Sequence, residues 1–97
     1  MIMVTAKITA KPDEKDEIIS KAQDLIDSSR FESGCISYNL YASTEEENVL
    51  LMLEQWENQE VLQLHMQTEH FQAFNTAIKD KLAGEVSIKV YSAESIN

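Results

Sequence analysis

Three side chains in the second half of the sequence have the types and spacing of a small proton-transfer site. Glu54 and Trp56 are two residues apart in an extended apolar segment, so in a strand they point to the same side of the sheet. His65 follows in a short segment with helical spacing, one turn beyond Val61. If that helix turns this face to the sheet, an acid, an imidazole and an aromatic wall converge on one cavity, which is the usual makeup of a small-ligand site.

Each of these residues also has a purely structural interpretation. Trp56 can be a core anchor, and His65 can be a structural core histidine whose ring nitrogens are both hydrogen-bonded. Glu54 needs a partner if it is buried, and that partner could be a lysine. His70, early in the last predicted helix, could lie on the surface. The sequence alone leaves both interpretations open.

The two tyrosines of the second predicted strand and the single cysteine are weaker candidates for a place in the site. Tyr38 and Tyr41 are three residues apart in a predicted strand, so they point to opposite faces and at most one shares the cavity with Trp56. Cys35 follows Gly34 and has no adjacent cation, which favours a small packed residue over a nucleophile.

Hydrophobic periodicity predicts the elements that position these residues. Apolar alternation favours strands over residues 2–9, 35–42, 49–56 and 86–91. Capping residues and apolar stripes favour helices from Pro12 to near Gly34, from Asn58 to His65 or Met66, and from Thr68 to Gly84. The predicted order is β-α-β-β-α-α-β.

Length, charge and cysteine content limit the classes of protein. The 97 residues suffice for one domain, expected over 1–97. The net charge of −9 repels nucleic acid and anionic membranes. One cysteine excludes an internal disulfide, and its spacing from the two histidines matches no structural metal site. Without a signal-peptide pattern or a long apolar run, we expect a cytoplasmic protein.

The third predicted strand, residues 49–56, indicates a partner subunit. It begins with five apolar residues in succession, so it is apolar on both sides of the pleat. Helices on one face of a four-stranded sheet leave the other face open. We therefore expect a homodimer in which two sheets stack.

Three segments together resemble a known family. They are residues 32–38 (ESGCISY), 54–57 (EQWE) and 65–71 (HMQTEHF). In this order and on these elements they are similar to the antibiotic biosynthesis monooxygenase (ABM) family, of the quinol monooxygenase type. The resemblance covers nearly the whole chain.

The resemblance implies a single ABM-like domain with a ferredoxin-like α+β fold. Its four-stranded antiparallel sheet carries the helices on one face, and two copies form a dimeric α+β barrel. It also implies a monooxygenase, an oxidoreductase that acts on a small aromatic or quinol-type substrate with O2 and without a cofactor or metal.

The resemblance further implies roles for individual residues. His65 would be the general base, because an imidazole pKa near ~6.5 suits proton transfer at neutral pH. Glu54 would orient it or share its proton, and Trp56 would form the aromatic wall. The expected substrate-binding residues are Tyr38, His70 and Phe74.

Departures from related families leave other functions open. Haem-degrading relatives use an asparagine on the first strand, where this chain has Thr5, which argues against haem degradation. An isomerase on a small carbonyl or sugar phosphate is the second possibility. The phosphate of a sugar phosphate would need cations, for which Lys7, Lys79 and Lys89 are candidates. A non-catalytic stress-response module that binds a small molecule is the third possibility.

Overall fold

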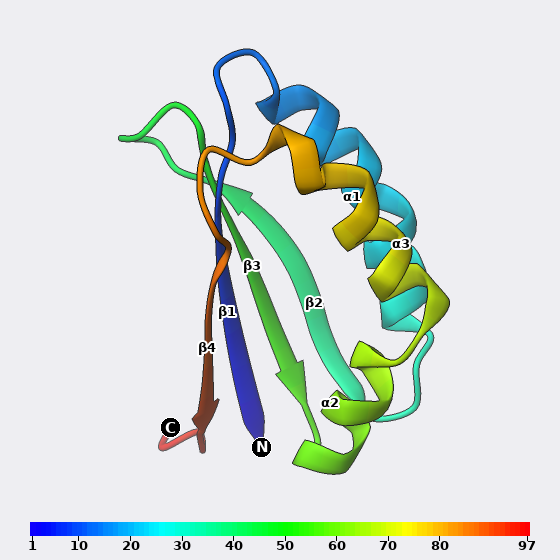
Figure 1. The fold of residues 1–97 in the computed structure, drawn as a ribbon. Helices are drawn as coiled ribbons and strands as arrows, with labels where there is room; N and C mark the ends of the chain where they lie inside the picture. Colours follow the sequence, from blue (N-terminus) through cyan, green and yellow to red (C-terminus); the bar gives the residue numbers. More distant parts are fainter.

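The computed structural model describes residues 1–97 as a sheet with helices on one face (Figure 1). The sheet has four antiparallel strands in the order β2-β3-β1-β4. The ferredoxin-like α+β prediction is confirmed. The bounds are β1 Ile2–Thr9, α1 Lys15–Arg30, β2 Cys35–Ala42, β3 Val49–Trp56, α2 Gln59–Met66, α3 Glu69–Ile78, the 3-10 turn η1 Lys79–Lys81 and β4 Ser87–Ser92.

The order of elements is as predicted, whereas several boundaries differ. The first helix begins at Lys15 instead of Pro12, because Asp13 has a φ of 68°, which no α-helix accommodates. It ends at Arg30, before the turn that leads to Gly34. The last helix ends at Ile78 and tightens into η1.

Side-chain caps fix the junction between α2 and α3. The Asn58 side chain accepts a hydrogen bond from the Val61 N–H at 3.0 Å and so caps α2. Thr68 accepts from the Phe71 N–H at 3.3 Å and caps α3. The Thr68 hydroxyl also donates to the carbonyl oxygen of His65 at 2.7 Å. The junction therefore holds the backbone of His65 directly.

Gly34 brings α2 close to the start of β2. It has a φ of +87°, and a Cβ there would lie 2.7 Å from the Val61 side chain. A residue without a side chain is thus required by both the backbone and the packing. This close approach places the face of α2 that carries His65 over the sheet.

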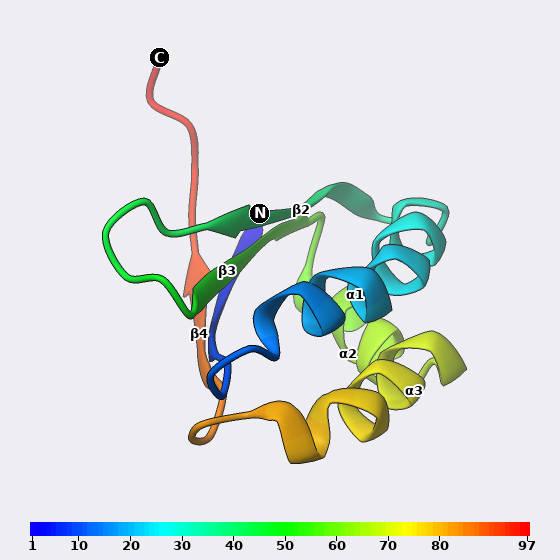
Figure 2. The same cartoon turned by 90° about the horizontal axis from the view of Figure 1, so that it is seen from above.

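The core lies between the helices and one face of the sheet. Figure 2 shows all three helices on the same side. The alternate residues of β3 that point to the helices are buried, and those on the other side are only half-buried. The buried residues of β3 are Leu50, Met52, Glu54 and Trp56.

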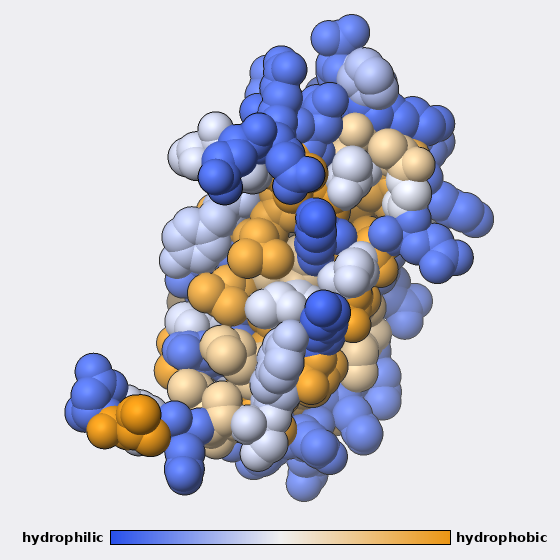
Figure 3. All heavy atoms as spheres, turned by 90° about the vertical axis from the view of Figure 1, so that its left-hand side faces the viewer, coloured by the Kyte–Doolittle hydropathy of each residue, from blue (hydrophilic) through white to orange (hydrophobic).

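The opposite face of the sheet has no helix over it. Figure 3 shows apolar patches interrupted by polar side chains on the side of the molecule that includes β4. Val49, Leu51 and Leu53 of β3 belong to the uncovered face and are half-buried. The expectation that β3 is apolar on both sides is thus met, although only one side is fully covered within the chain. None of the three helices is long and apolar enough to cross a membrane.

Candidate active site

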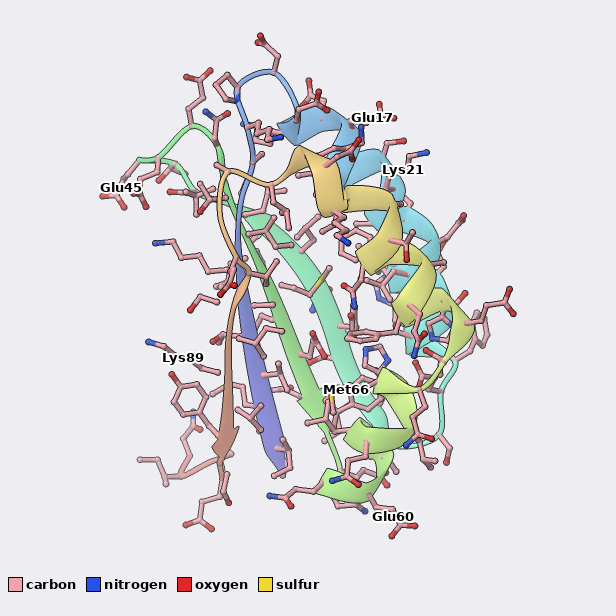
Figure 4. The ribbon with its side chains drawn as sticks, in the orientation of Figure 1. Glu17, Lys21, Glu45, Glu60, Met66 and Lys89 are labelled. Atoms are coloured by element: carbon pink, nitrogen blue, oxygen red, sulfur yellow. The ribbon has the colours of Figure 1, made fainter.

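A cavity of about 90 Å³ lies between the sheet and the helices α2 and α3. One water needs only ~10–15 Å³ of such space, so the cavity suits a small molecule. Fourteen of its seventeen lining residues are apolar, and the other three are Glu54, His65 and Asn75. We call it the sheet–helix cavity. Figure 4 shows the side chains between the sheet and the helices, with Met66 at the α2 end.

The cavity opens at the β4 edge of the sheet. Ile88 and Val90 line it and are 57% and 53% exposed. Both point to the helix side, because they pair with Ala6 and Val4 on β1. No helix reaches over them, so a ligand can enter between β4 and α3.

His65 is held by a carboxylate that sequence reasoning did not assign a role. Its Nδ1 lies 2.7 Å from Oε2 of Glu32, and Nε2 of His70 lies 2.7 Å from the same oxygen. Because an ionised carboxylate only accepts hydrogen bonds, both of these ring nitrogens carry hydrogen and donate to Glu32. The Nε2 atom of His65 is then left as the acceptor.

The Nε2 atom of His65 faces Tyr38 and accepts a hydrogen bond from its hydroxyl group at 3.4 Å. Both side chains line the sheet–helix cavity and are almost fully buried, with 1% and 2% exposure. The ring of Trp56 is tilted by 38° to the imidazole at a ring-centroid distance of 4.6 Å, and Phe71 meets the imidazole edge-on at 5.1 Å. The ring of His65 is therefore fixed on several sides.

Glu54 lies in the same wall without contacting His65 through a hydrogen bond. On the sheet it is flanked by Val4 and Tyr38 in the strand register. Its Oε1 accepts a hydrogen bond from the indole N–H of Trp56 at 3.0 Å. The carboxyl group lines the cavity and is 5% exposed.

Burial shifts the pKa values of these groups toward their neutral forms. Desolvation raises the pKa of Glu54 to about 7, against the hydrogen bond from Trp56 that lowers it. Desolvation also lowers the pKa of His65, although its contact with Glu32 acts in the opposite direction. The pKa of the Tyr38 hydroxyl is raised, again chiefly by burial. At neutral pH the site holds a neutral imidazole and a carboxyl group near its midpoint.

The structure brings most of the predicted site residues together. Tyr38, Glu54, His65 and Phe74 line the cavity. The thiol of Cys35 is partly buried, and burial raises its pKa. A raised thiol pKa agrees with the prediction that Cys35 is a packed residue and not a nucleophile.

Two of the predicted residues lie elsewhere than expected. Trp56 is fully buried behind His65 and does not line the cavity, so it supports the imidazole instead of forming the wall. His70 is 24% exposed, contacts Glu32 and is not among the residues that line the cavity. It therefore does not face a molecule bound there.

Glu32, which the sequence analysis left without a role, lies in the turn between α1 and β2. It takes the position next to His65 that was expected for Glu54. It comes 33 residues before His65, and no periodicity links the two. The only signal was its place at the start of the segment ESGCISY.

The arrangement can remove a proton from a small acidic molecule. The acceptor is Nε2 of His65, and the Glu32 carboxylate stabilises the imidazolium that forms. The hydroxyl of Tyr38 and the carboxyl group of Glu54 can donate hydrogen bonds to an oxyanion in the same cavity. Fold and site thus define a small ferredoxin-like α+β protein with a buried carboxylate–imidazole pair in an apolar cavity.

Comparison with known proteins identifies the family. A sequence model of the family described as antibiotic biosynthesis monooxygenase matches residues 1–77. The Bacillus subtilis protein named "Putative monooxygenase YcnE" is 36% identical over 88 residues, which cover 91% of this chain and 93% of that protein. This chain belongs to the antibiotic biosynthesis monooxygenase family.

Two further proteins are similar to this chain over nearly its whole length. Protein sll1783 of Synechocystis is 42% identical over 90 residues, and the match spans 93% of this chain but 61% of that protein. A conserved protein from Methanosarcina mazei Go1, of solved structure, has a TM-score of 0.91 at 31% identity, with 96% of this chain and 92% of that chain covered.

Proposed function

We propose that this protein is a cofactor-independent monooxygenase of small phenolic or quinol-type aromatic molecules. In the reaction a phenol and O2 give a quinone and water. One oxygen atom forms a bond to a ring carbon, and the other leaves as water with the two hydrogens that the substrate loses. The substrate is oxidised and O2 is reduced, so the balance needs no further reductant.

The observation that carries the proposal is the unprotonated Nε2 of His65 at the wall of the sheet–helix cavity, where its only partner is the hydroxyl of Tyr38 at 3.4 Å. Its partner nitrogen is occupied by Glu32 at 2.7 Å, so Nε2 accepts the phenolic proton. The resulting phenolate is electron-rich and can pass an electron to O2. The apolar lining keeps water from quenching the intermediates.

Glu54 and Tyr38 give the substrate its orientation. With its pKa raised to about 7, Glu54 is protonated in about half of the molecules at neutral pH and can then donate a hydrogen bond. The hydroxyl of Tyr38 stays protonated because its pKa is raised. Two donors beside one base suit a ring that carries two oxygen substituents.

A phosphorylated substrate fits the cavity poorly. The lining contains no lysine or arginine. Lys89 pairs with Thr5 and lies on the uncovered face of the sheet with Lys7, and Figure 4 shows Lys89 pointing away from the helices. Lys79 is exposed in η1. We therefore prefer the aromatic substrate to a sugar phosphate.

We also propose that the protein works as a homodimer through the uncovered face of the sheet. Val49, Leu51 and Leu53 lie there, paired with Thr9, Lys7 and Thr5 of β1. A second copy of the same face would remove these apolar groups from water. Sedimentation that shows only monomer at micromolar concentration would contradict this proposal.

The test of the activity is oxygen uptake with a panel of hydroquinones and phenols. We expect uptake with at least one of them, and 18O2 should place one labelled atom in the quinone and one in water. His65→Gln should reduce the rate by ~10²–10⁴-fold, the usual contribution of a general base. The surface variant Glu60→Gln should leave it unchanged. No uptake with the panel, or equal uptake by His65→Gln, would contradict the proposal.

A further inference from the structure

The side chains of Glu32, His65 and His70 form a cluster that the proposed reaction uses only in part. They come from three elements: the turn after α1, helix α2 and helix α3. One ligating atom of each residue lies within 4.8 Å of the other two. Two imidazoles and one carboxylate are a frequent ligand set for transition metals. We infer that this cluster is a binding site for a divalent transition-metal ion such as zinc.

The geometry requires little change to admit the ion. Zinc binds nitrogen and oxygen at ~2.0–2.2 Å, which holds its ligand atoms roughly 3–3.5 Å apart. Here Oε2 of Glu32 lies 2.7 Å from each of the two nitrogens. A small outward rotation of the Glu32 side chain opens a position between the three atoms.

The charge around the cluster also favours a cation. No lysine or arginine forms a salt bridge with Glu32, whose ionic contacts are the two imidazoles alone. The single guanidinium of the chain, that of Arg30, donates to the carbonyl of Tyr38 and to the side chain of Asn39. The carboxylate therefore has no permanent positive partner, and a divalent ion would supply one.

Access is from the surface and not from the cavity. His70 is 24% exposed and Glu32 15%, whereas His65 is 1% exposed. Neither His70 nor Glu32 lines the sheet–helix cavity. An ion that enters past His70 would thus lie behind the imidazole of His65, with its open positions toward solvent.

Binding would change which nitrogen of His65 carries hydrogen. The ion takes the lone pair of Nδ1, so the hydrogen of the neutral ring moves to Nε2, where the Tyr38 hydroxyl lies 3.4 Å away. A metal-bound imidazole usually donates its other N–H in this way. Under the proposed function, on which this consequence rests, zinc takes away the base and inhibits turnover without entering the cavity.

The binding test needs no substrate. Purified, untagged protein is titrated with Zn²⁺ in competition with a chromophoric chelator, and with Co²⁺ while its visible absorption is recorded. We expect one ion per chain. Mg²⁺ and Ca²⁺, which prefer all-oxygen ligands, should not compete. Binding should weaken at least about 100-fold in His70→Gln and in Glu32→Gln, since loss of even an outer-shell partner costs ~10–100-fold.

Two variants serve as controls. Glu60→Gln removes the same charge as Glu32→Gln from an exposed position and should bind zinc as the native protein does. Cys35→Ser removes the only thiol of the chain, the other side chain that could bind zinc, and should have the zinc affinity of the native protein. Equal zinc affinity of the native protein and His70→Gln, or a loss of binding in Cys35→Ser, would overturn the proposal.

A separate measurement distinguishes the site from the activity. Zinc should inhibit oxygen uptake by the native protein and leave His70→Gln uninhibited at the same concentration. Zinc binding without any oxygen uptake by the metal-free protein would support the site and contradict the proposed function. Oxygen uptake that saturating zinc does not slow would overturn the inhibitory role.

Discussion

The imidazole of His65 and the carboxylate of Glu32 are joined by a contact of 2.7 Å between Nδ1 and Oε2. This contact links a residue of α2 to the turn after α1 and leaves Nε2 as the acceptor nitrogen of the ring. Because His65 lines an apolar cavity, we propose the pair as the base that removes a proton from the substrate.

Replacing Glu32 by glutamine should lower the pKa of His65 further. Burial already lowers that pKa, and the contact with Glu32 raises it in part, so loss of the charge removes the opposing effect. The 15N and 1H shifts of the ring, followed by NMR over pH, measure this directly. A pKa that stays constant or rises would show that Glu32 is not the electrostatic partner of His65.

Replacing Glu54 by glutamine should change how stability depends on pH. The pKa of Glu54 is raised to about 7 in the folded state, from 4.5 as its ordinary value. Folding therefore favours the protonated form, and the stabilisation is complete below pH 4.5 and lost as the pH rises through 7. The native free energy of unfolding, relative to Glu54→Gln, should fall by roughly 3 kcal/mol across this window.

Urea denaturation of both proteins between pH 4 and 8 checks that difference. The variant Glu60→Gln, on an exposed turn of α2, controls for the change in net charge. A native-minus-variant difference that is constant over pH would mean that Glu54 titrates normally.

Gly34 and Gly84 should respond in opposite ways to alanine. At Gly34 an added Cβ meets Val61 at 2.7 Å and the φ is +87°, whereas nothing lies within 4 Å of a Cβ at Gly84. We expect Gly34→Ala to lower the free energy of unfolding by about 1–3 kcal/mol and Gly84→Ala to change it by less than about 0.5 kcal/mol. Thermal unfolding of the two variants gives the comparison, and equal stabilities would refute the packing of α2 on Gly34.

A large residue at Val90 should close the entrance of the sheet–helix cavity. Val90 lines the cavity at the β4 edge and is 53% exposed, so Val90→Trp has room to fold while it narrows the opening. We expect KM to rise at least about tenfold with a smaller change in kcat. Lys79→Trp, exposed in η1 and outside the cavity lining, should change neither value; equal kinetics for the two variants would place the entrance elsewhere.

The sequence predicted the fold well because its signals are local. Alternation in the strands and the caps Asn58 and Thr68 give the order of elements and the side of the sheet on which Glu54 lies. The contact of Glu32 with His65 could not be predicted, since a loop residue shows no period and the two are 33 residues apart.

The position of Trp56 relative to the cavity likewise could not be predicted from the sequence pattern. Strand alternation puts it on the helix side, as observed, but only the packing of α2 decides that His65 lies between it and the cavity. The same packing brings the ring centroids of His65 and His70 to 6.0 Å from each other, with both rings in contact with Glu32.

The most direct test of the account is the ionisation state of a bound phenol in the absence of O2. A chromophoric phenol with a pKa one to two units above the buffer pH is mixed anaerobically with the native protein and with His65→Gln. We predict that the native protein binds it with the absorption spectrum of the phenolate, and that the variant binds it as the neutral phenol. A neutral bound phenol in the native protein, or phenolate in both proteins, would contradict the assignment of His65 as the base.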